Sequence, residues 1–252
     1  MSQPIDQAGF KAMWEQMQDA GYFNQHPHYR DYFGQELTAE DRALDTAILD
    51  LDFSRDDIEM PAPYSESLER AVKRTEAEWL YKMFRLPGSG TALDLGCGFG
   101  RSVAWLCERY EQVVATDISG SVIELARRLI KADNVDFYVN DADGLPADIH
   151  PASVDVAYIF TVFQHIPREF ADKLLRQVAD KLRPGGIAVF NLISEVNENL
   201  NDGVPETEWA IGYSRGQTYS LVADAGLQCE RIVRWYRPEN DVSWLWVAAR
   251  KS

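Results

Sequence analysis

Short apolar runs alternate with amphipathic helical patterns through most of the chain after Thr91, and this alternation limits the fold more than any other feature. Strand-like runs lie at 92–95, 113–117, 135–140, 154–162 and 187–193, and helical patterns lie at 101–110, 121–132 and 168–182. Buried strands joined by helical crossovers form a parallel sheet with helices on both faces. We therefore predict an α/β fold with a Rossmann-like, doubly wound sheet.

The end of the chain departs from this alternation. Two strand-like runs, 227–236 and 242–249, are separated only by residues 237–241. A loop of about five residues joins antiparallel strands, because a parallel crossover needs a dozen residues or more. We expect the sheet to end in a C-terminal antiparallel hairpin, which makes seven strands, mostly parallel.

The segment before the sheet is helical and aromatic in pattern. Residues 1–75 are predicted to form an N-terminal helical lid over the sheet, and residues 76–252 are predicted to form the core. The lid carries a run of aromatic residues, of which Trp14, Tyr22, Tyr29 and Tyr32 are candidates for a closing pocket. For any one of them, packing of helices on the sheet is the commoner role.

Composition excludes several classes of function. Of the 252 residues, 46% are hydrophobic and 26% are charged, which is typical of a globular protein and not of a disordered or coiled-coil chain. The formal net charge of −15 would repel a nucleic acid backbone, so no nucleic acid partner is expected. No membrane-spanning run or signal-peptide pattern occurs, and the three cysteines lack metal-ligand spacing, so a cytoplasmic protein is expected.

A glycine-rich turn follows the first strand of this alternation. The stretch Ala92-Leu93-Asp94-Leu95-Gly96-Cys97-Gly98-Phe99-Gly100-Arg101 leads from a buried strand into a helix, as in nucleotide-type sites. A dinucleotide fingerprint would read G-x-G-x-x-G, and here the third glycine comes one position early. The Asp94 carboxylate would also repel a pyrophosphate, whereas it suits a ligand with a cationic group at that place.

An acidic residue ends the second strand at a suitable distance from this turn. Asp117 comes 23 residues after Asp94, close to the spacing of about 20 residues at which a carboxylate meets ribose hydroxyls. These features together resemble the class I S-adenosylmethionine (SAM)-dependent methyltransferases, and the turn at 182–190, with Leu182-Arg183-Pro184-Gly185-Gly186, resembles the one that precedes their fifth strand. The likeness covers about residues 76–252.

The resemblance implies SAM as cofactor, S-adenosyl-L-homocysteine (SAH) as product and no metal. It implies that Asp117 holds the ribose, that Ile118 packs on the adenine, that Asp141 accepts a hydrogen bond from the adenine amino group, and that Phe160 borders the methionine portion. The expected cofactor contacts are Asp94, Gly96, Cys97, Gly98, Gly100, Asp117, Ile118, Asp141, Ala142 and Phe160.

The stretch after the fourth strand, Phe160-Thr161-Val162-Phe163-Gln164-His165-Ile166-Pro167, is predicted to lie beside the reacting methyl group. His165 is the candidate catalytic base, because histidine titrates near neutrality. Bracing of the next helix is an equally good reading, since Gln164 stands where similar enzymes often carry a glutamate. The connection 194–212 contributes Trp209 to the candidate acceptor site, beside Tyr22, Tyr29 and Tyr32.

We therefore expect methyl transfer to nitrogen or oxygen of a small molecule. An O-methyltransferase that acts on a sugar or on a polysaccharide end is the next reading, and a SAM-binding partner protein without catalysis is a third. A nicotinamide dehydrogenase is disfavoured by the glycine spacing and by Asp94. The sequence does not specify the oligomeric state.

Overall fold

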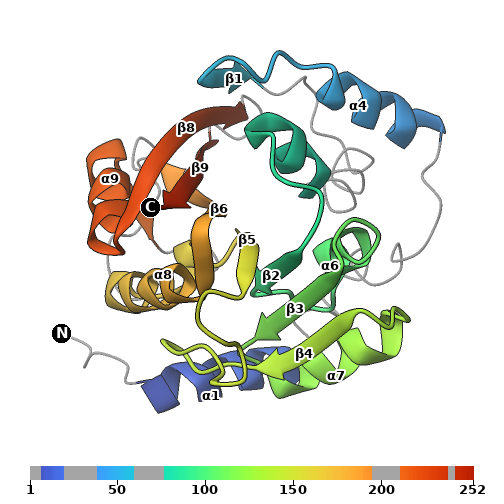
Figure 1. Ribbon diagram of the computed structural model, residues 1–252, viewed down its shortest axis with the longest axis vertical. Coiled ribbons are helices and arrows are strands. Elements are labelled where there is room, and N and C mark those ends of the chain that lie inside the picture. The colour runs from blue at the N-terminus through green and yellow to red at the C-terminus, as the bar shows by residue number, and fades with distance from the viewer. Residues whose placement is uncertain (1–6, 20–38, 60–76, 195–210, 238–241) are drawn as a thin grey trace.

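The computed structural model describes residues 7–19, 39–59, 77–194, 211–237 and 242–252. A single sheet forms the centre of the molecule, with helices on both of its faces (Figure 1). The strands lie in the order β1-β8-β9-β6-β5-β2-β3-β4, and β7 pairs with β6. Their bounds are β1 Asp57–Glu59, β2 Thr91–Leu95, β3 Gln112–Asp117, β4 Val135–Val139, β5 Val154–Ile159, β6 Leu182–Ser194, β7 Gly212–Tyr213, β8 Leu227–Arg237 and β9 Val242–Lys251.

Two apolar clusters cover the two faces of the sheet. One cluster is formed with residues of α8 (Arg168–Lys181), α9 (Arg215–Asp224) and α1 (Gln7–Asp19), and the other with residues of α6 (Arg101–Leu106), α7 (Gly120–Leu129) and α4 (Ala39–Leu49). Residues 77–84 form a further helix on the second face. Every residue of β5 is buried, as expected for a parallel strand covered on both faces.

The structure confirms the predicted fold class. Strands β2 to β6 pair in parallel. Strand β9 runs antiparallel to both β6 and β8, and β8 and β9 form the expected C-terminal hairpin. The predicted count of seven strands is wrong, since the described residues form nine. The additional strands, β1 and β7, have three and two residues, too few to show a periodic pattern in the sequence.

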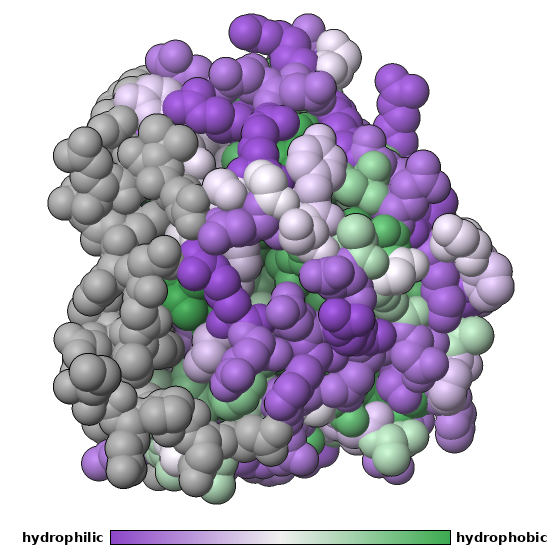
Figure 2. All heavy atoms as spheres, turned by 90° about the vertical axis from the view of Figure 1, so that its left-hand side faces the viewer, coloured by the Kyte–Doolittle hydropathy of each residue, from purple (hydrophilic) through white to green (hydrophobic). Residues whose placement is uncertain are grey.

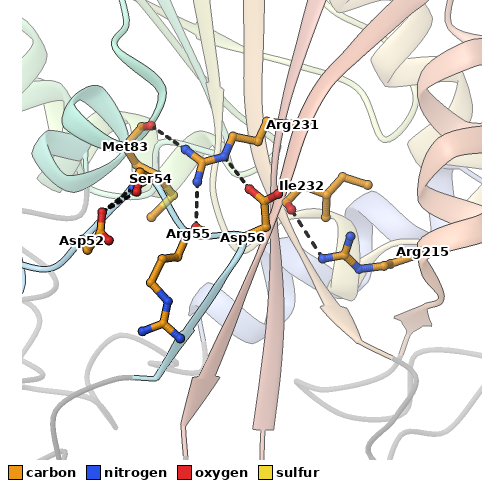
Figure 3. Close-up of polar contacts among 8 residues, drawn as sticks. All are labelled: Asp52, Ser54, Arg55, Asp56, Met83, Arg215, Arg231 and Ile232. Carbon is orange, nitrogen blue, oxygen red and sulfur yellow. Dashed lines mark hydrogen bonds and ion pairs between the residues drawn. The ribbon is translucent and has the colours of Figure 1, made fainter.

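Strand β1 extends the sheet beyond the hairpin, within a segment that the sequence predicted to be helical. It lies parallel to β8, and Arg231 of β8 holds the turn that precedes it (Figure 3). The guanidinium of Arg231 forms an ion pair with Asp56 (2.7 Å) and donates to the carbonyls of Arg55 (2.7 Å) and Met83 (3.2 Å). One side chain therefore ties β8, the turn before β1 and the helix at 77–84 together.

Helix α1 packs on the core, although it is far from the sheet in the sequence. Phe10 is fully buried and meets the ring of Phe170 in α8 edge-on, with ring centroids 5.8 Å apart. Figure 1 shows α1 beside α7 and below β4, near the carboxyl ends of the central strands. This position agrees with a covering role, while the boundary between a lid at 1–75 and a core at 76–252 stays a prediction.

The face of the molecule drawn in Figure 2 is mainly hydrophilic, and its apolar residues lie in small separate areas. Within the described ranges, none of the helices is long and apolar enough to pass through a membrane.

Candidate functional site

The predicted cofactor residues meet at one edge of the sheet. Strand β2 pairs in parallel with β3 on one side and with β5 on the other, and β3 pairs with β4 (Figure 1). Gly96, Ile118, Asn140 and Phe160 therefore follow the ends of four neighbouring parallel strands. Ligands of open α/β sheets bind outside this edge, where the strand order reverses direction.

The glycine turn after β2 has no room for a side chain at Gly96 and has a left-handed backbone at both Gly96 and Gly98. Gly96 has φ +77°, and a Cβ atom there would overlap Cγ2 of Val162, in the segment after β5. Gly98 has φ +54°, a conformation that glycine adopts without strain. The backbone N–H groups of Gly96 and Cys97 donate to the Thr116 carbonyl at 2.8 and 2.9 Å, so the turn is fixed to β3.

Asp117 is held in place by the same turn. Its two carboxylate oxygens accept backbone N–H groups from Gly98 (2.9 Å) and Ser119 (3.0 Å). Burial raises the pKa of the Asp117 carboxyl above its ordinary value, and these hydrogen bonds partly offset the effect. Each oxygen retains a second lone pair, so the carboxylate can also accept two hydroxyl groups of a ligand.

The other predicted cofactor positions differ in exposure. Asp94, on β2, and Ala142 are buried, at 2% and 3% exposure, and Ile118 is partly buried against the core. Asp141 is exposed and forms an ion pair with Lys11 of α1 (3.2 Å), and Lys11 also donates to the carbonyl of Asn140 (3.3 Å). The predicted adenine contact thus already has a cationic partner, so a ligand would have to share or displace Lys11.

The residue after Phe160 has an unusual backbone. The Phe160 ring packs between Tyr158 and Trp246, so only its backbone is placed to contact a ligand. Thr161 has φ +53°, which is rare for a β-branched residue. Its N–H donates to the side-chain oxygen of Asn191 (2.7 Å), a residue of β6 that is 1% exposed. This turn carries Val162 against Gly96.

His165 lies in a short 3₁₀ helix, η1 (Phe163–His165), and its surroundings are apolar. The Trp14 ring of α1 meets it edge-on, with centroids 5.6 Å apart, and the Nε2 atoms of Gln164 and His165 are 3.3 Å apart. Burial lowers the pKa of His165 from 6.5 to about 4. The residue is therefore neutral at physiological pH, and its weak basicity gives no support to the predicted base role.

Four predicted acceptor contacts, Tyr22, Tyr29, Tyr32 and Trp209, lie outside the described residues. In the part that the structure describes, no three His, Cys, Asp or Glu side chains are grouped as a metal site would require. Cys97 is buried, and its desolvation raises the pKa of the thiol well above the ordinary value, so it is not a reactive nucleophile.

Sequence reasoning missed Lys11 and Asn191, and it gave Thr161 no role of its own within the stretch 160–167. Asn191 carried a signal, because it is the one polar residue in the apolar run 187–193. Lys11 carried none, since it contacts a position 130 residues away.

Comparisons with known proteins agree with this geometry. Residues 92–186 match a family described as "Methyltransferase domain". The chain is 31% identical to "Methyltransferase GfsG" of Streptomyces halstedii over 56% of this chain and 49% of that protein. It is 33% identical to "Trans-aconitate 2-methyltransferase" of Azoarcus sp. over 57% of this chain and 56% of that protein. The chain thus spans about half the length of these curated relatives.

A solved structure extends the likeness of the fold over the whole chain. Magnesium protoporphyrin IX methyltransferase from Synechocystis, solved with bound SAM, has a TM-score of 0.62 to this chain at 15% identity, and the match covers 100% of both chains. At this identity the match concerns the fold alone.

Proposed function

We propose that this chain, which carries a class I SAM-dependent methyltransferase domain, transfers a methyl group from SAM to an oxygen or nitrogen atom of a small molecule. The observation that carries the proposal is the Asp117 carboxylate, anchored by Gly98 and Ser119 beside the glycine turn. The cytoplasmic location expected from the sequence is part of this proposal.

The residues present fit SAM. Asp117 offers lone pairs for both ribose hydroxyls, and Ile118 supplies an apolar surface beside it for the adenine. The buried carboxylate of Asp94 suits the ammonium of the methionine portion and would repel the pyrophosphate of a dinucleotide. Gly96 allows the Val162 side chain to pack directly against the turn, because a Cβ at this position would overlap Cγ2 of Val162.

SAM supplies, when bound, a methyl group already activated on a sulfonium. In the transfer, the bond from sulfur to the methyl carbon breaks as the acceptor's lone pair forms the new bond, SAH leaves as a neutral thioether, and any acceptor proton passes to water. The protein's main contribution is therefore alignment of the acceptor with the methyl group. Thr161 and the η1 segment, at the end of β5, are placed to line the acceptor side.

The finer choice among acceptors also belongs to this proposal. An acceptor that is already ionised, or a neutral amine, needs no strong base, which agrees with the lowered pKa of His165. A sugar hydroxyl must lose a proton during the reaction, so the weak basicity of His165 disfavours the glycan reading. The similarity to a trans-aconitate 2-methyltransferase, whose name specifies a small-molecule acceptor, supports a small molecule.

Calorimetric titration tests which cofactor the protein binds. We expect SAM and SAH to bind with micromolar dissociation constants and NAD to bind at least about a hundredfold more weakly, in line with typical cofactor affinities. NAD binding in the absence of SAM binding would contradict the proposal.

Turnover is then tested by SAH production with phenols, carboxylic acids, amines and sugars. SAM binding with no SAH from any acceptor class would favour the reading of a partner protein without catalysis.

A further inference from the structure

The side chain of Gln164 is buried beside His165 and has only one polar partner in the described residues. Gln164 is 1% exposed, and its Nε2 atom lies 3.3 Å from Nε2 of His165. Its Oε1 atom is buried and has no hydrogen-bond partner among the residues that the structure describes. The amide therefore has one useful contact, and that contact is with a ring nitrogen of the candidate catalytic histidine.

The orientation of this amide follows from the cost of the alternative. As it stands, the carbonyl oxygen and one of the two N–H donors of the amide have no partner among the described residues. Rotating the amide would place Oε1 against His165 and would leave an NH₂ group with two N–H donors in the same partnerless position. Buried N–H groups without partners are rarer in proteins than buried carbonyls without partners. The donor side of Gln164 therefore faces His165.

A donor at Nε2 decides the tautomer of the ring. In a neutral imidazole one nitrogen carries the proton and the other carries the lone pair. Because Nε2 accepts from Gln164, its lone pair is used and the proton resides on Nδ1. A ring in this state has no free lone pair with which to take a proton from an acceptor.

We propose that Gln164 is a positioning residue that fixes His165 with its proton on Nδ1, so that His165 is a hydrogen-bond donor at Nδ1 and does not act as a base. The inference rests on the proposed methyl transfer for its role and on the Gln164–His165 contact for its geometry. It also gives a physical reason for a glutamine at a position where a glutamate would have the opposite effect.

The environment of the ring agrees with this assignment. Burial is the cause of the lowered pKa of His165, so a neutral ring persists well below neutral pH. Among the side chains that the structure describes, the charged groups are Lys11 and Glu15 on α1 and Arg168, Glu169, Asp172, Lys173, Arg176, Asp180 and Lys181 on α8, and none of them is a cause of the pKa shift of His165. Lys11 is paired with Asp141, and the Arg168 guanidinium donates to the Gly212 carbonyl and lies over the Tyr213 ring.

Nitrogen-15 NMR of the folded protein, labelled at histidine and free of ligands, tests the tautomer directly. The His165 signals are assigned by their loss in His165→Gln. We expect a proton-bearing Nδ1, a bare Nε2, and no protonation until the pH falls well below about 6. A proton on Nε2, or a protonation midpoint at about 6 to 7, would overturn the proposal whatever the enzyme's activity.

Substitution of Gln164 provides a second test of the proposal. In Gln164→Glu the new carboxylate accepts from the ring, so the proton should move to Nε2 and the protonation midpoint of His165 should rise by one unit or more. The matched control is Gln177→Glu, because Gln177 bonds the backbone of Asp143 and Leu145 and has no contact with His165. An unchanged tautomer in Gln164→Glu would show that Gln164 does not set it.

The activity of the same proteins separates this inference from the proposed function. If SAM binds and is turned over but His165 carries its proton on Nε2, the function stands and the inference fails. If the tautomer is as expected but no acceptor is methylated, the contact stands and its catalytic meaning fails. If Gln164→Glu does not fold, the spectrum of the parent protein alone decides the tautomer.

Discussion

The side-chain oxygen of Asn191 accepts the backbone N–H of Thr161 at 2.7 Å and holds that residue at φ +53°. A non-glycine residue in this conformation costs about 1–3 kcal/mol and persists only where its surroundings impose it. Asn191 is buried in β6, so the conformation of the turn after β5 depends on the neighbouring strand. Through Val162, the same turn packs against Gly96 of the glycine turn after β2, which is the predicted cofactor loop.

The first prediction concerns this link. Asn191→Ala should destabilise the fold by about 1–3 kcal/mol, because the Thr161 N–H loses its partner, and should also weaken SAM binding as Val162 shifts. Thr161→Gly should retain SAM binding, and in the double variant it should recover part of the lost stability, since glycine adopts positive φ freely. Thermal melts and calorimetry measure both effects.

Asn134→Ala is the matched control for Asn191→Ala. The Asn134 side chain bonds the carbonyls of Cys107 and Tyr110 at 3.0 Å each, away from the cofactor loop. Its loss should lower the melting temperature and leave SAM affinity unchanged. If Asn191→Ala behaves in the same way, the link between Asn191 and the cofactor loop is wrong.

The second prediction concerns Asp117. Asp117→Ala should weaken SAM binding about tenfold or more, because a charged acceptor shared by two hydroxyls contributes on the order of 1.5–3 kcal/mol. Asp133→Ala, at an exposed carboxylate after α7, should leave the affinity unchanged. Equal SAM affinity in the parent and in a folded Asp117→Ala would remove the ribose assignment.

The pH dependence of binding follows from the same residue. Burial raises the pKa of Asp117 above 3.8, and the ligand needs the ionised form. SAM affinity should therefore be full above this raised pKa and should fall as the pH drops through it, while the protein is still folded. Titrations at several pH values, with circular dichroism as a check on folding, measure the effect.

Much of this arrangement could be predicted from the sequence, because the glycine turn and the acids at strand ends are local patterns with a fixed geometric meaning. Asp117 and Gly98 lie 19 positions apart and still meet, because parallel neighbouring strands end at one edge. The pairing of Lys11 with Asp141 depends on how α1 packs, and no local pattern encodes it. The three residues of β1 form a strand only because β8 offers an open edge and Arg231 an anchor.

The third prediction concerns that anchor. Arg231→Leu should lower the free energy of unfolding by about 1.5–3 kcal/mol, because the Arg231 guanidinium is the shared donor to three acceptors. The backbone amides of β1 should also exchange hydrogen faster. Arg215→Leu is the control, since the exposed Arg215 makes one longer bond, to the Ile232 carbonyl at 3.4 Å (Figure 3). Equal effects of the two substitutions would contradict the anchoring role.

The fourth prediction concerns stability and His165. The unfolded chain takes up a proton at this residue near pH 6.5, whereas the folded protein does so only at about 4, since burial lowers the pKa of His165. The neutral ring's contribution to stability should therefore be full above pH 6.5 and should be lost progressively as the pH falls toward 4. His165→Gln removes this dependence, so the difference in unfolding free energy between the two proteins should change across that range. A constant difference would show that His165 titrates normally.

The last prediction concerns which acceptors react. If His165 donates a hydrogen bond from Nδ1–H and takes no proton, the acceptor must lose its proton to water or arrive already ionised. For two phenols of different acidity, kcat/KM should rise with pH through two different midpoints, each set by the pKa of the phenol. Aliphatic alcohols and sugars should react at least about a hundredfold more slowly, because general base catalysis, which contributes typically 10²–10⁴-fold, is missing. A single midpoint at about 6 to 7 for both phenols, lost in His165→Gln, would instead assign the proton to His165. That result would show that His165 acts as a base, and a sugar hydroxyl would then again be a possible acceptor.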